Sequence, residues 1–143
     1  MAEATLHETL LTYTLRKNYL NVEISNLQSQ KTLAVYSQAD AKSIKAQDEQ
    51  EIRDFFKALY EEDPEYKGKY KDYTQIPDFE AEMDKIAAKY NDELAELTAW
   101  ETALDAQITT DSAELEEINA YMESMKSMLS SNIQEDFNYG LNG

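Results

Sequence analysis

Apolar residues recur every three or four positions along the second half of the chain, from Phe79 to Phe137. This spacing places their side chains on one face of an α-helix. We therefore expect a helix over residues 79–139, with an apolar ladder formed by Phe79, Met83, Ile86, Tyr90, Leu94, Leu97, Trp100, Leu104, Ile108, Leu115, Ile118, Met122, Met125, Leu129, Ile133 and Phe137.

A second ladder occupies the first part of the chain and predicts a helix over residues 4–60. Its early members follow a seven-residue rhythm that Lys17 interrupts: Leu6, Leu10, Tyr13, Leu20, Ile24 and Leu27. Beyond Leu33 the spacing approaches eleven residues, which changes the supercoil locally. The stretch 36–50 contains Ile44 as its only large aliphatic residue, so a new helix capped by Asp40 is an alternative. We favour one continuous helix.

Residues 61–78 hold both prolines and predict the connection between the two helices. Asp63-Pro64 and Ile76-Pro77 each disfavour the helical conformation in the residue before the proline. Gly68 lies between them, in a segment expected to form a short hairpin or an irregular tip. Asp78 is predicted to be the N-cap of the second helix. Two helices of similar length joined by one break predict an all-α fold, a long antiparallel helical hairpin (coiled coil) in a single domain, 1–143.

The segment Thr109-Thr110-Asp111-Ser112 allows an alternative fold, a three-helix bundle. Asp111 followed by Glu114 resembles a capping box, although that motif prefers Ser or Thr at its first position. A turn here would divide the second helix in two. Against it, the segment contains no glycine or proline, and Ile108 and Leu115 keep the seven-residue phase. We therefore favour a continuous helix.

Composition supports a helical protein and excludes several kinds of site. The chain has 143 residues with three glycines, two prolines and no cysteine, so it has few turn formers and no thiol chemistry. No run of eighteen apolar residues is present, which predicts that no segment spans a membrane. The first residues show neither a basic nor an apolar leader region, and we expect a cytoplasmic protein or one exported without a cleaved signal peptide.

The net charge of −16 is unevenly distributed. Residues 1–60 carry eight acidic and seven basic residues, whereas residues 79–143 carry fifteen acidic and three basic residues. This acidity disfavours nucleic acid as a partner. The acidic helix is either a solvated face or a docking face for a basic partner or divalent cations.

No catalytic, cofactor-binding or metal-binding motif is present. His7 is the only histidine, so neither a histidine-based triad nor a di-iron carboxylate bundle with two Glu-x-x-His motifs is available. The sequence therefore predicts a non-enzymatic protein without a cofactor. The most distinctive local feature is the basic, aromatic connection, which either contacts a neighbouring molecule or packs against the helix ends through Tyr66, Lys67, Lys69, Tyr70, Lys71 and Tyr73.

An isolated hairpin leaves apolar flanks in water, so we expect copies of the chain to cover one another. The predicted function is a self-assembling coiled-coil subunit of a filament or scaffold. The predicted interface comprises Leu6, Leu10, Leu20, Ile24, Leu27, Leu104, Ile108, Leu115, Ile118, Met122, Met125, Leu129, Ile133 and Phe137. The alternative is an acidic helical adaptor or chaperone that masks the amphipathic helix of another protein, and a metal-loaded bundle is a third hypothesis.

The C-terminal segment 130–137 reads Ser-Ser-Asn-Ile-Gln-Glu-Asp-Phe. It combines apolar, amide and aromatic residues, as the C-terminal ends of needle proteins do. Together with the long terminal helices, it makes the chain resemble subunits of flagellar and type III secretion filaments. The resemblance implies pairing of the two terminal helices into a coiled coil, helical stacking of subunits, and export without a cleaved leader. The chain differs from needle proteins in its greater length and in the absence of their tight turn.

Overall fold

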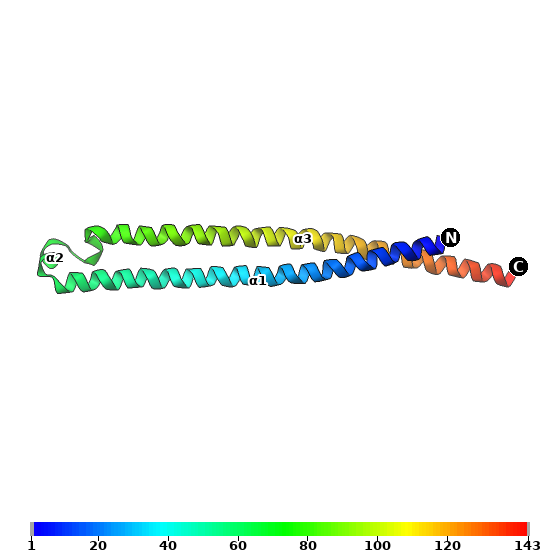
Figure 1. Ribbon diagram of the computed structural model, residues 1–143, viewed down its shortest axis with the longest axis horizontal. Helices are drawn as coiled ribbons and strands as arrows, with labels where there is room; N and C mark the ends of the chain where they lie inside the picture. Colours follow the sequence, from blue (N-terminus) through cyan, green and yellow to red (C-terminus); the bar gives the residue numbers. More distant parts are fainter. Residues whose placement is uncertain (1, 143) are drawn as a thin grey trace. The chain divides into compact units, whose positions relative to one another are not determined.

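The computed structural model describes the backbone of residues 2–142 and the side chains of residues 4–135. Four elements follow one another along the chain: α1 (Ala2–Glu62), α2 (Pro64–Lys69), the 3₁₀ turn η1 (Tyr73–Gln75) and α3 (Pro77–Asn142). Helix α1 packs against α3, and the described residues contain no strand (Figure 1). The prediction of an all-α helical hairpin is confirmed.

Helix α3 is continuous through the segment at which a three-helix bundle would have turned. The hydroxyl of Thr110 donates to the carbonyl oxygen of Ala106, 3.0 Å away and one turn earlier, so this threonine is satisfied within the helix. Asp111 is buried and does not cap a new helix. Because nothing in the segment stops the helix and its apolar phase is preserved, the chain forms a hairpin.

The chain divides into two compact units, which are described separately. Unit 1 comprises residues 1–30 and 104–143, and unit 2 comprises residues 31–103. In unit 1, Leu20, Ile118 and Met122 form a buried cluster, against which Leu10, Tyr13 and Leu115 pack. These residues come from the two predicted ladders. The apolar seam of this unit therefore closes within one chain.

Unit 2 replaces part of the apolar seam with small and polar residues. Ala34 and Ala41 are buried at positions where larger side chains would hold the helices apart. The buried Tyr90 donates a hydrogen bond to Asp48 Oδ2 at 2.5 Å, and the amide of Gln38 donates to Glu101 at 2.9 Å. The weakly apolar stretch 36–50 thus stays helical because polar contacts with α3 substitute for the missing ladder residues.

The connection was predicted to form a short hairpin or an irregular tip, and it forms the short helix α2 followed by the 3₁₀ turn η1. Asp63 accepts a hydrogen bond from the backbone N–H of Glu65 at 2.9 Å and caps α2, and Asp72 does the same for η1 through the N–H of Thr74 at 2.9 Å. The prediction of Asp78 as an N-cap was wrong, because α3 begins one residue earlier, at Pro77. Proline has a helical φ and no N–H, so it suits the first helical position.

Candidate functional site

Most residues of the predicted interface lie in the seam of the hairpin. Within unit 1, Leu20, Leu104, Ile118 and Met122 are buried. Another group is half-buried: Leu6, Leu10, Ile24, Leu27, Ile108, Leu115, Met125 and Leu129. Ile133 is 52% exposed, and the side chain of Phe137 lies outside the described residues. The structure thus brings the two ladders together within one chain, so the buried members cannot also contact a second copy while the hairpin stays closed.

A different set of apolar side chains is exposed on α1. The outer stripe, as we call it, comprises Leu11, Leu15, Tyr19 and Val22, which are 59%, 62%, 55% and 62% exposed. Their spacings of four, four and three residues place them on one face of the helix. That face points away from the seam, because the seam positions of the same turns are Leu10, Tyr13 and Leu20.

The outer stripe was not predicted, although the sequence contains a signal for it. Leu10-Leu11 and Tyr19-Leu20 are pairs of adjacent apolar residues. Neighbouring residues on an α-helix point about 100° apart, so both members of such a pair cannot face one seam. One residue of each pair must therefore lie outside the buried face of the helix. In this structure these residues are Leu11 and Tyr19, which face outward.

An ion pair crosses from α1 to α3 beside the outer stripe. Arg16 Nε and Nη2 donate to Glu114 Oε1 and Oε2 at 2.8 and 3.0 Å, a two-pronged contact that holds both side chains in place. Hydrogen bonds from Arg16 lower the pKa of Glu114. The guanidinium also lies 5.0 Å from the centre of the Tyr19 ring. Arg16 thus links the outer stripe to the acidic helix.

Two tyrosines stack across the hairpin next to this ion pair. The rings of Tyr13 and Tyr121 are 5.8 Å apart and inclined by 26°. The hydroxyl of Tyr121 donates to Glu117 Oε1 at 3.0 Å, and this hydrogen bond raises the pKa of Tyr121. The two rings border a groove of about 400 Å³ that we call the tyrosine groove; its lining is Thr12, Tyr13, Arg16, Glu114, Glu117, Ile118 and Tyr121.

The seam of unit 1 also contains a pair of acids. Asp111 is 5% exposed, and its Oδ2 has no hydrogen-bond partner. Glu23 on α1 faces it; burial raises the pKa of Glu23, and the nearby Asp111 carboxylate raises it further. Two carboxylates that meet in a partly desolvated seam repel each other unless one holds a proton. We therefore expect this acid pair to destabilise the hairpin locally once both carboxylates are ionised.

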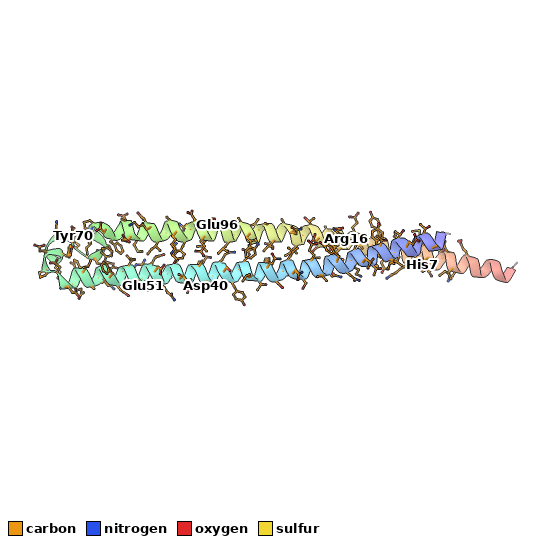
Figure 2. All side chains as sticks on the ribbon, in the orientation of Figure 1. His7, Arg16, Asp40, Glu51, Tyr70 and Glu96 are labelled. Carbon is orange, nitrogen blue, oxygen red and sulfur yellow. The ribbon has the colours of Figure 1, made fainter. Side chains whose placement is uncertain are left out.

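The tip of the hairpin, in unit 2, is built by its own aromatic residues. Tyr66 stacks on Tyr70 at 6.0 Å, and Tyr73 meets Phe79 edge to face at 5.4 Å (Figure 2 shows Tyr70 at the tip). The hydroxyl of Tyr60 lies 2.8 Å from the carbonyl oxygen of Lys71. The three predicted contact tyrosines thus contribute to packing of the tip, whereas the three lysines remain exposed: Lys67, Lys69 and Lys71.

No group of three or more His, Asp or Glu side chains with the geometry of a metal site occurs among residues 4–135. In the same part of the chain, no helix has a stretch both long and apolar enough to cross a membrane.

Comparison with models of protein families, with curated proteins and with solved structures found no match to this chain.

Proposed function

We propose that this protein is a non-enzymatic structural subunit that self-associates through the outer stripe of α1 and builds a filament or scaffold. The observation that carries the proposal is the exposure of four large apolar side chains at helical spacing: Leu11, Leu15, Tyr19 and Val22. The outward positions of a two-helix coil are usually polar, because they face water. Single exposed apolar residues need no explanation, but a contiguous apolar stripe is typical of an interaction surface.

The charges around the outer stripe favour contact between copies. A chain of net charge −16 repels itself wherever two acidic faces meet. Residues 9–22, which contain the stripe, include Arg16 and Lys17 and no acidic residue. This segment is therefore a place where an acidic face of a second copy can approach the molecule without meeting further acidic residues on α1.

The tip supplies a second, weaker contact in the proposed assembly. Lys67, Lys69 and Lys71 are exposed, and α3 carries most of the negative charge of the chain. Contact of these lysines with the acidic helix of a neighbour would add attraction that salt screens. Raising the salt concentration is therefore expected to weaken this contribution while leaving the apolar contact largely intact.

Size-exclusion chromatography with light scattering over a hundredfold concentration range tests the proposal. Species that grow with concentration support self-assembly and justify imaging them for helical order. A monomer at every concentration refutes it. That result would favour the alternative function, an acidic adaptor whose exposed apolar surface receives an amphipathic helix of another protein.

A further inference from the structure

Unit 1 carries two unlike surfaces next to each other. The outer stripe is convex and apolar, and the tyrosine groove is concave, with the buried Ile118 in its lining and the stacked Tyr13 and Tyr121 at its border. We propose that the outer stripe of one copy docks into the tyrosine groove of the next copy, an inference that rests on the proposed function. The contact then joins two different surfaces and is heterologous.

The size and lining of the groove suit an aliphatic side chain. Its volume of about 400 Å³ leaves room for an aliphatic side chain, and its lining includes the buried Ile118 and the rings of Tyr13 and Tyr121. The polar groups at its edge are already paired within the chain, Arg16 with Glu114 and Tyr121 with Glu117. An occupant therefore needs no hydrogen-bonding groups of its own. Leu15 and Val22, the most exposed members of the stripe, meet this requirement.

The charges select α1 of the second copy as the occupant. On the α3 side the groove is lined by two acidic residues, Glu114 and Glu117, and by no basic residue. The surrounding segment 111–123 contains five acidic residues and no basic residue. Residues 9–22 of α1 contain two basic residues and no acidic residue. Docking of α1 beside this acidic segment brings opposite charges together, whereas docking of a second α3 would place acids against acids.

A heterologous contact determines the kind of assembly. Each copy offers one stripe and one groove, so a bound pair still has a free stripe at one end and a free groove at the other. Such contacts form rings if the rotation between copies closes and open filaments if it does not. A contact of stripe with stripe would instead consume both stripes in a closed dimer. The proposed docking thus explains how a single hairpin could continue to add copies.

A complementation experiment separates these arrangements. One variant loses the stripe and keeps the groove (Leu15→Gln with Val22→Gln). The other loses one wall of the groove and keeps the stripe (Tyr121→Ala). Each variant alone is expected to stay monomeric at concentrations at which the unaltered chain assembles. Their equimolar mixture is expected to form a one-to-one complex and nothing larger, because only one intact stripe meets one intact groove.

Two results would overturn the docking: assembly of Tyr121→Ala alone, which would show that the stripe binds elsewhere, or a mixture that remains monomeric. Because Tyr121→Ala also removes the stack with Tyr13, Glu117→Lys provides a second groove variant. It places a positive charge at the exposed edge of the groove and should likewise block assembly. It removes the acceptor of the Tyr121 hydroxyl but keeps both rings of the aromatic pair. Tyr121→Phe keeps the ring and should assemble. Failure of the unaltered chain to assemble would instead refute the proposed function.

Discussion

Replacing Leu15 and Val22 together by glutamine removes the most exposed part of the outer stripe without adding charge. Both side chains are 62% exposed, so most of their surface is still available for burial against another molecule. Complete burial of such a side chain contributes about 1.5–3 kcal/mol. Scaled by the exposed fraction, the two residues together contribute about 3 kcal/mol to one contact.

This estimate predicts how far the variant weakens self-association. Since about 1.4 kcal/mol corresponds to a tenfold change in Kd, a loss of about 3 kcal/mol weakens each contact about a hundredfold. That figure applies to a heterologous contact, which uses one stripe. A stripe-to-stripe contact loses both copies of each side chain, and the effect doubles to about 6 kcal/mol, roughly ten-thousandfold. Analytical ultracentrifugation over a wide concentration range measures this difference.

The variant must leave the hairpin itself unchanged for this comparison to hold. Glutamine is a good helix former, and exposed substitutions usually alter stability by less than about 0.5 kcal/mol. The helical circular dichroism signal and the melting temperature of the monomer should therefore match those of the unaltered chain. Val35→Gln is the matched control, because Val35 is also exposed on α1 but lies in unit 2. A double variant that assembles like the unaltered chain would refute the role of the stripe.

Three further predictions concern the folding of the chain. Leu20→Ala should lower the free energy of unfolding by about 3 kcal/mol, because Leu20 is 0% exposed in the seam, and denaturant titration measures the loss. The pKa of Glu23 in the folded chain is raised above its ordinary 4.5. Protonation of Glu23 therefore stabilises the fold fully below pH 4.5, and this stabilisation is lost as the pH rises through the raised pKa. Asp111→Asn should therefore raise the melting temperature at about pH 7 and flatten its rise on acidification; an unchanged pH profile would contradict the pairing. Tyr90→Phe should lower the melting temperature, because it removes the hydrogen bond to Asp48. That hydrogen bond raises the pKa of Tyr90 to about 12, so an ultraviolet titration of the variant should lack a tyrosine that ionises near this pH.

Much of the fold follows from periodicity. The apolar ladder from Phe79 onward kept its phase across 109–112, and α3 is continuous there because a helix stops only where the backbone or a cap stops it. The two prolines indicated the connection because proline disfavours the helical conformation in the residue before it. The start of α3 was predicted two residues too late, at Phe79 instead of Pro77. Asp78 has the side chain of a cap, whereas Pro77 has the backbone of a first helical residue.

The polar features of the seam were harder to predict. Nothing in the spacing of residues along one helix shows which residue on the other helix faces it, so the sequence did not pair Glu23 with Asp111 or Tyr90 with Asp48. Asp111 suggested a helix start because aspartate is a common cap. Asp111 lies between Ile108 and Leu115 in the seven-residue repeat, so it belongs to the face of α3 that packs against α1. It is buried because α1 covers that face, and the sequence of α3 alone does not show this.

The outer stripe was missed for a related reason. An apolar ladder predicts that its side chains will be buried, but the period is the same whether the covering helix belongs to the same chain or to another. Once the hairpin closes, Leu20, Ile118 and Met122 are used within the chain. The surface left for a partner is then the apolar residues that the ladder could not include, such as Leu11 and Tyr19. In a long helical hairpin, the residues that break the seam periodicity therefore carry more information about partners than those that obey it.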